Sequence, residues 1–194
     1  MDYRLSPEYY PPPAPVKIII AGGFGVGKTT AVNSISDTPP LTTEAAMTDL
    51  GSNVDFTTAV PNKVTTTVAI DFGTIALDLG LKLYLFGLPG QNRFGFMWDD
   101  ICIGAIGALV IVDTRRIDDC YAAVDYFEQT GIPFAVAVNM FYGELPHALD
   151  DVRWALAVQG DTPVITFDAR GRASVREALK TVCWHALQRT TAVH

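Results

Sequence analysis

The sequence predicts one α/β domain in which a mostly parallel sheet lies between two layers of helices, and three observations predict it. Apolar, β-branched runs alternate along the chain with helices that carry one apolar face. The 194 residues, 49% of them hydrophobic, suffice for one core and leave little room for a second. The 18% charged content excludes a disordered chain. Strands buried on both faces need helices above and below them, so a mostly parallel sheet with right-handed crossovers follows.

The amino-terminal end is predicted to lie outside this domain. Five of the twelve prolines fall within residues 7–15, which is typical of an extended, polyproline-like segment without a core of its own. We therefore expect a flexible arm over residues 1–15 and a single domain over residues 16–194.

The domain starts with a predicted strand, a glycine-rich loop and a helix. Val16 begins an apolar run that ends in glycines, and the helical pattern extends from Lys28 to about Ile35. Residues 37–64 are rich in Pro, Thr, Asp and Asn and have little periodicity, so they are predicted to form one long connection. Connections of this length are usually functional or mobile.

Two strand-like segments follow, and after them strands and helices alternate to the end of the chain. Residues 65–79 and 81–86 meet at Asp78-Leu79-Gly80, a tight-turn sequence, so these two strands are expected to be antiparallel neighbours. The later strands, separated by amphipathic helices, are expected at residues 105–112, 134–138 and 164–167.

Charge and hydropathy exclude several functions. Fourteen Lys and Arg residues against 21 Asp and Glu residues give a net charge of −7, which disfavours a broad electrostatic grip on nucleic acid or anionic lipid. The longest apolar stretch, residues 101–112, is well below the roughly 20 residues that span a bilayer. The chain shows no signal segment or prenylation box, and its three cysteines lack metal-type spacing. We expect a cytoplasmic, unlipidated protein with buried thiols.

The loop between the first strand and the first helix carries the strongest motif. Gly22 to Thr29 fits G-x-x-x-x-G-K-[ST], a glycine-rich loop whose backbone N–H groups curl around phosphates at a helix amino terminus. Lys28 would contact the β and γ phosphates, and the Thr29 hydroxyl would bind Mg²⁺. An incidental glycine-rich turn is the structural alternative. The residues expected around the phosphates are Gly22, Gly23, Phe24, Gly25, Val26, Gly27, Lys28, Thr29 and Thr30.

Further motifs resemble those of a known family. Residues 65–73 (TTTVAIDFG) and 85–94 (LFGLPGQNRF) resemble the two switch segments of Ras-like small GTPases. Together with residues 97–100, 112–116, 138–139 and 168–170, they are similar to the small GTPases encoded in actinobacterial conservon operons, relatives of bacterial polarity GTPases. The resemblance covers about residues 16–187. It implies a phosphate-loop NTPase fold, a Ras-like three-layer sandwich with one antiparallel strand, and identifies residues 37–64 as a long switch-one loop.

The resemblance also assigns roles to single residues. It implies that Thr67 is the switch-one threonine, a Mg²⁺ ligand in the triphosphate state, and that Gln91 orients the attacking water. Gly90 would reach the γ-phosphate through its N–H. Asn139 would belong to the base-recognition motif, and the N–H of Ala169 would contact the guanine oxygen. The ligands implied are GTP or GDP with Mg²⁺.

Each assignment has a purely structural alternative. Thr65 to Thr67 are also ordinary β-branched strand formers, and Leu88 to Gln91 also fits a common turn. Asn139 would serve equally as a cap for the loop that follows its strand. Arg93 invites comparison with an arginine finger, although a structural contact explains it more simply.

Two positions depart from the family pattern. Gly87 stands where Ras-like enzymes have the aspartate that holds Mg²⁺ through water, so the acid would have to come from Asp71 or Asp113, unless both are solvated or capping carboxylates. Tyr142 stands where the base motif has its carboxylate, a loss worth about 1–3 kcal/mol of guanine selectivity. Glu144 is a possible substitute by loop folding.

These observations favour a guanine-nucleotide switch that slowly hydrolyses GTP, with Lys28 and Gln91 as catalytic residues and no evident arginine in cis. Two competitors stay open: a phosphate-loop ATPase or kinase with Asp113 as its metal acid, and a pseudo-GTPase that acts as a nucleotide-stabilised docking module. The resemblance implies a roadblock-type regulator and a sensor-kinase-like protein as partners. Residues 94–98, rich in aromatics, would be either interface anchors or core.

Overall fold

The computed structural model describes residues 13–39, 41–47, 66–77 and 80–191. The strands are β1 (Ala14–Ala21), β2 (Leu41–Met47), β3 (Thr66–Leu77), β4 (Leu81–Gly87), β5 (Ala105–Val112), β6 (Phe134–Asn139) and β7 (Val164–Phe167). The helices are α1 (Lys28–Ile35), α2 (Trp98–Cys102), α3 (Tyr121–Thr130), α4 (Leu149–Ala155) and α5 (Arg172–Thr191), with short 3₁₀ helices η1 (Asn92–Met97), η2 (Thr114–Cys120) and η3 (Phe141–Gly143).

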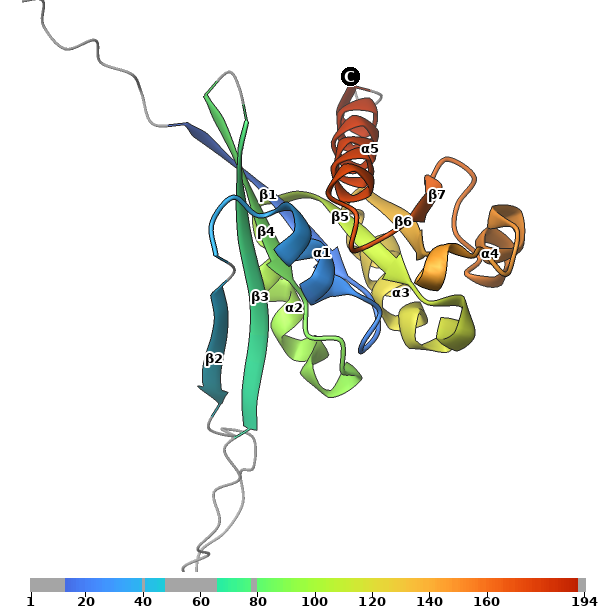
Figure 1. Cartoon of the computed structure of the whole chain (residues 1–194), viewed down its shortest axis with the longest axis horizontal. Helices are drawn as coiled ribbons and strands as arrows, with labels where there is room; N and C mark the ends of the chain where they lie inside the picture. Colours follow the sequence, from blue (N-terminus) through green and yellow to red (C-terminus); the bar gives the residue numbers. More distant parts are fainter. Residues whose placement is uncertain (1–12, 40, 48–65, 78–79, 192–194) are drawn as a thin grey trace, which may run out of the picture.

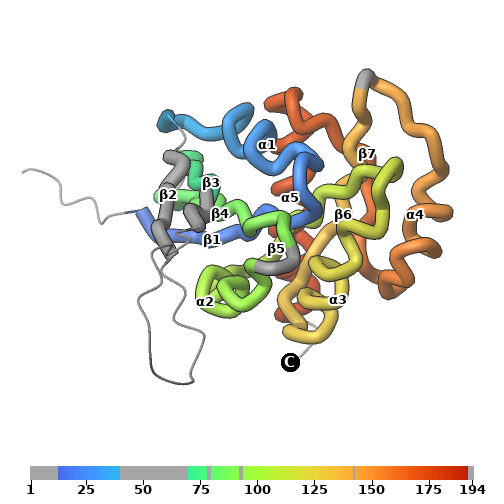
Figure 2. Tube along the Cα trace, turned by 90° about the horizontal axis from the view of Figure 1, so that it is seen from below, coloured from blue at the N-terminus to red at the C-terminus, as the bar shows by residue number. Residues whose placement is uncertain are grey.

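All of these strands form one sheet in the order β2-β3-β4-β1-β5-β6-β7 (Figure 1). β3 runs antiparallel to both of its neighbours, and the other pairings are parallel. α1 packs against α5, and α1 lies on the opposite side of the sheet from α2 and α3 (Figure 2). The predicted fold, a three-layer α/β sandwich with one antiparallel strand, is confirmed.

The central strands are buried on both faces, as their continuous apolar runs predict. In β1, Ile18, Ile19 and Ile20 are at most 1% exposed, and residues 108–112 of β5 are fully buried. The carboxyl ends of these parallel strands meet at one edge of the sheet, where the phosphate loop begins. The core therefore fixes the position of that edge.

The structure corrects two predicted boundaries. β1 begins at Ala14 rather than Val16, because the Ala14 N–H donates to the Gly80 carbonyl at 2.8 Å and Ala14 pairs with Leu81. β2 lies inside residues 37–64, which were expected to form one connection without secondary structure. Its pairing with β3 supplies the ladder that local propensity does not predict. The rest of that connection, residues 48–65, and residues 1–12 of the predicted arm lie outside the described residues.

The cysteines and the helices bear on two further expectations, buried thiols and no bilayer-spanning segment. Cys102 and Cys120 are buried thiols, and Cys183 is half-buried. Among the described residues, no helix combines the length and apolar character needed to cross a bilayer.

Candidate functional site

The phosphate loop leaves β1 and enters α1 in a conformation that requires glycine. Gly22, Gly25 and Gly27 have φ angles of 127°, 74° and 111°, a region that L side chains rarely adopt. A Cβ on Gly22 would collide with the Ile111 carbonyl oxygen of β5, and one on Gly23 would lie 2.5 Å from the Asp119 Cβ. The loop is thus pressed against neighbouring elements on its outer side.

Lys28 fills the inside of the loop. It is 9% exposed, and its ammonium donates to the carbonyls of Gly22 and Gly23 at 3.0 and 2.6 Å. Burial lowers its pKa from 10.5 to about 8, although the nearby Asp71 carboxylate acts in the opposite direction. A buried ammonium whose pKa is lowered by burial favours an anionic partner, as a polyphosphate would be.

The segment predicted to sense the γ-phosphate lies directly against this lysine. A Cβ on Gly90 would be 2.5 Å from the Lys28 Nζ and 2.7 Å from the Gly23 carbonyl oxygen. Gln91 follows in an extended conformation, with an exposed side chain at the start of η1. Gly90 and Gln91 therefore lie beside the loop, as the sequence motif predicts.

A hydroxyl and a carboxylate meet at the first turn of α1. The Thr29 Oγ1 donates to the Asp71 Oδ2 at 2.7 Å. A Cβ on Gly87 would lie 3.0 Å from the Asp71 Cβ and 3.2 Å from its Oδ2. The Asp71 carboxylate thus covers the position at which Ras-like enzymes have their aspartate, and a side chain at position 87 would crowd it.

The second predicted metal ligand is not brought to this place. Thr67 pairs with Ala46 in the outer half of β3, four residues before Asp71. At about 3.3 Å per residue in a strand, that separation is roughly 13 Å along the chain. The structure therefore joins Thr29 to Asp71 and leaves Thr67 apart from them. Among the described residues, no three His, Cys, Asp or Glu side chains form a metal-binding group.

Asp113, the other candidate acid, is occupied elsewhere. It is 1% exposed, and both of its oxygens accept from the Arg115 guanidinium at 2.9 and 2.8 Å. These hydrogen bonds, chiefly, hold its pKa below the ordinary value. Arg115 also lies 4.1 Å from the ring centroid of Phe141, just beyond β6. Of the two acids that the sequence leaves open, Asp113 is thus engaged by Arg115, and its carboxylate ties β5 to the loop after β6.

Asn139, at the end of β6, joins the turn after β7 to the phosphate loop. Its Nδ2 donates to the Val26 carbonyl at 2.9 Å, and its Oδ1 accepts from the Ala169 N–H at 3.2 Å. It is 8% exposed, and a Cβ on Gly27 would lie 2.8 Å from its Nδ2. The structure brings Asn139 and Ala169 together, with the Ala169 N–H engaged by Asn139.

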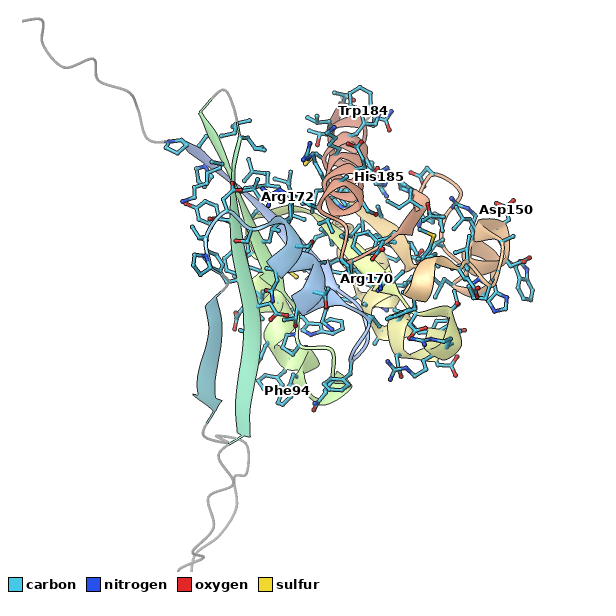
Figure 3. The ribbon with its side chains drawn as sticks, viewed as in Figure 1. Phe94, Asp150, Arg170, Arg172, Trp184 and His185 are labelled. Carbon is cyan, nitrogen blue, oxygen red and sulfur yellow. The ribbon has the colours of Figure 1, made fainter. Side chains whose placement is uncertain are left out.

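Other predicted residues surround the site. Phe24 in the loop is 64% exposed, and Thr30 is exposed on α1. The aromatic segment at residues 94–98 divides in two, because Phe94 and Trp98 are buried while Phe96 is 64% exposed. Figure 3 labels Phe94, in η1 after β4, and Arg170, in the turn between β7 and α5. Glu144 is exposed, and the side chains of Arg93 and Tyr142 lie outside the described part.

One residue of the site escaped the sequence prediction. The Arg116 guanidinium, from η2, donates to the Phe24 carbonyl of the phosphate loop at 2.7 Å. The only signal in the sequence is its place in Asp113-Thr114-Arg115-Arg116, directly after a buried strand that ends at the same edge of the sheet.

Comparison with known proteins agrees with this geometry. A family model described as "conserved hypothetical ATP binding protein" matches residues 20–189. Uncharacterized protein MJ1339 of Methanocaldococcus jannaschii is 29% identical over 126 residues, which are 64% of this chain and 69% of that protein.

Solved structures with a similar fold include three FeoB domains. The G domain of the T. maritima FeoB iron transporter is 18% identical, with a TM-score of 0.61 over 89% of this chain and 99% of that one. The Methanococcus jannaschii FeoB G domain is 15% identical, with a TM-score of 0.56 over 89% and 98%. A GDP-bound NFeoB mutant of S. thermophilus is 19% identical, with a TM-score of 0.59 over 88% and 61%. These likenesses show that the chain has the fold of those FeoB domains.

Proposed function

The chain belongs to the family described as conserved hypothetical ATP-binding proteins, and we propose that within this nucleotide-binding family it is a guanine-nucleotide switch that slowly hydrolyses GTP to GDP and phosphate. One observation carries the proposal: the buried Lys28 ammonium is held by loop carbonyls, with Gly90 pressed against it. Phosphate oxygens at the same place would give this ammonium charge-assisted hydrogen bonds, which are stronger than those to neutral carbonyls.

The residues at the start of α1 fit a magnesium ion. A hydroxyl and a carboxylate 2.7 Å apart are ligands that Mg²⁺ accepts beside phosphate oxygens and water. When bound, the ion neutralises charge on the β and γ phosphates. Thr29 and Asp71 would hold it, Lys28 would bind the phosphates, and Gln91 would orient the attacking water. Thr67 would join the site only in the triphosphate state.

Base preference is the step that most needs measurement. Asn139 fastens the base loop to the phosphate loop, which supports guanine recognition, whereas the carboxylate missing at Tyr142 weakens it. The family description favours an ATPase as a second candidate. Both oxygens of Asp113 already accept hydrogen bonds from Arg115, which counts against an ATPase that uses Asp113 to bind its metal ion.

A titration of GDP, GTP, ADP and ATP, with and without Mg²⁺, separates these candidates. We expect guanine nucleotides to bind more tightly, and Lys28→Ala to weaken all four by about 3 kcal/mol, or about a hundredfold. Lys17→Ala is the matched control, because Lys17, on β1, donates to the Ile103 carbonyl at the end of α2, away from the loop. Tighter binding of ATP would establish the ATPase candidate, and unchanged affinity in Lys28→Ala would refute the site.

Single-turnover hydrolysis separates a switch from a docking module. We expect Gln91→Leu to slow hydrolysis of bound GTP by about a hundredfold, because the attacking water loses its orientation. Gln129→Leu, an exposed residue on α3, is the control. Equal rates in the wild type and Gln91→Leu would favour a pseudo-GTPase, and many turnovers per second without a partner would contradict a slow switch.

The conservon-type resemblance extends the proposal to cellular context. We propose a cytoplasmic protein that works with a roadblock-type regulator and a sensor-kinase-like protein. The exposed Phe96, beside the Gln91 segment, suits a hydrophobic anchor for the regulator. Binding of that regulator should weaken in Phe96→Ala and depend on whether GTP or GDP is bound.

A further inference from the structure

The two consecutive arginines after β5 point to different places. Arg115 is fastened to the buried Asp113 and covers Phe141, beside β6. Arg116 adopts φ −145° and ψ 54°, which interrupts η2. As a result its guanidinium points to the phosphate loop and donates to the Phe24 carbonyl at 2.7 Å. The backbone break therefore places a permanent positive charge on the loop.

The surroundings of this guanidinium leave it free to change partners. The side chain is 49% exposed, and its carboxylate neighbours Asp119 and Asp113 lie at 3.4 and 3.9 Å, farther than the 2.8 Å contact that fastens Arg115. Among the described residues, a Cβ on Gly25 would have only the Arg116 Nη2, at 3.5 Å, within 4 Å. The guanidinium thus borders open space at the exposed part of the loop.

The backbone of η2, which carries Arg116, is nevertheless fixed relative to the loop. Asp119 of the same 3₁₀ helix packs on Gly23 so closely that a Cβ there would lie 2.5 Å from the Asp119 Cβ. A side chain that borders open space and whose backbone is fixed can reach a ligand in the loop without movement of that backbone. Such pre-organised charge is what stabilises a phosphoryl-transfer transition state.

We propose that Arg116 is a catalytic arginine supplied in cis, an inference that rests on the proposed GTP hydrolysis. With GTP bound, its guanidinium exchanges the Phe24 carbonyl for oxygens of the β and γ phosphates. The water oxygen bonds to the γ-phosphorus, and the bond from that phosphorus to the bridging oxygen breaks. The electron pair stays on the β-phosphate of GDP, where Arg116 stabilises it, and the water protons leave with phosphate and solvent. Competition from the Phe24 carbonyl keeps turnover slow.

The test measures hydrolysis and affinity on the same preparations of Arg116→Ala and Arg116→Lys. We expect single-turnover hydrolysis in Arg116→Ala to fall by about 10²–10³-fold while the Kd values for GDP and GTP change by less than about threefold. Arg116→Lys should recover only part of the rate, because an ammonium lacks the planar fork. The matched control is Arg172→Ala, an equally exposed arginine that pairs with Asp37 at 2.8 Å.

A transition-state analogue supplies a readout that a purely structural role would not move. The wild type and Arg172→Ala should form a complex with GDP and aluminium fluoride, and Arg116→Ala should not. A hydrolysis rate equal to that of the wild type, or a loss confined to GDP and GTP affinity, would overturn the role of Arg116 alone. Failure of the wild type to hydrolyse GTP would instead overturn the proposed function, and the role of Arg116 with it.

Discussion

The phosphate loop and residues 66–71 of β3, whose Asp71 lies beside Thr29, are held very differently. The loop is confined from three sides, with Gly22 against β5, Gly23 against η2 and Gly27 against Asn139 of β6. Residues 66–71 of β3 pair with β2 alone, because the pairing with β4 begins at Phe72. A two-stranded ribbon is marginally stable in water.

This difference separates binding from response. The loop is preformed, so a ligand meets little ordering cost there. The β3 segment carries Asp71 and Thr67 and pairs with β2 alone, so fewer strand pairings hold it in place. We therefore expect substitutions at the loop to change stability and affinity, and substitutions at β3 to change the dependence on Mg²⁺ with little effect on the fold.

The largest effect is expected at Gly22. Gly22→Ala should lower the free energy of unfolding by about 3 kcal/mol or more, because it combines a strained φ with a collision against the Ile111 carbonyl. Gly80→Ala, at φ +70° with no atom of the described residues within 4 Å of an added Cβ, should cost only about 1 kcal/mol. Urea denaturation of both variants measures the difference, and equal losses would show that the loop is not confined.

An intermediate effect is expected at Asp71. Asp71→Asn should weaken the Mg²⁺ affinity of the GTP-bound protein by about 10–100-fold, since the carboxylate beside Thr29 is lost. Unfolding of the nucleotide-free protein should change by less than about 1 kcal/mol. Asp150→Asn on α4, at the far end of the sheet (Figure 3), is the control. Unaltered Mg²⁺ affinity would remove Asp71 from the site.

The smallest effect is expected at Lys28, where nucleotide binding should take up part of a proton. Because burial lowers the pKa of Lys28 to about 8, the free protein at pH 8.5 lacks about three quarters of a proton there, and bound phosphate should restore it. Calorimetry in buffers of different ionisation enthalpy should detect this uptake in the wild type and miss it in Lys28→Arg, which stays charged. Identical uptake in both proteins would assign the proton to another group.

The same pKa shift sets the pH dependence of the nucleotide-free fold. Between pH 8 and pH 10.5 the unfolded chain holds the Lys28 proton and the folded chain releases it. The contribution of Lys28 to stability therefore rises with pH across this window.

The sequence predicted the loop and the sheet because both rest on short-range patterns, a glycine spacing and continuous apolar runs. It singled out Asn139 as a polar residue at the end of a buried strand, but not its hydrogen bonds to Val26 and Ala169. The ladder between β2 and β3 joins segments far apart in the chain, so local propensity could not reveal it. The choice between Asp71 and Asp113 depended on the orientation of Arg115. Arg116 was missed because a single backbone break at that residue decides its direction.

The burial of Trp98 has a practical consequence. It lies in α2, directly after the segment that holds Gln91, and is 6% exposed, whereas Trp154 and Trp184 are 86% and 65% exposed. Iodide in solution should quench the fluorescence of Trp154 and Trp184 but not that of Trp98. The remaining emission then comes from Trp98, close in sequence to Gln91, so nucleotide exchange can be followed in real time without attaching a dye.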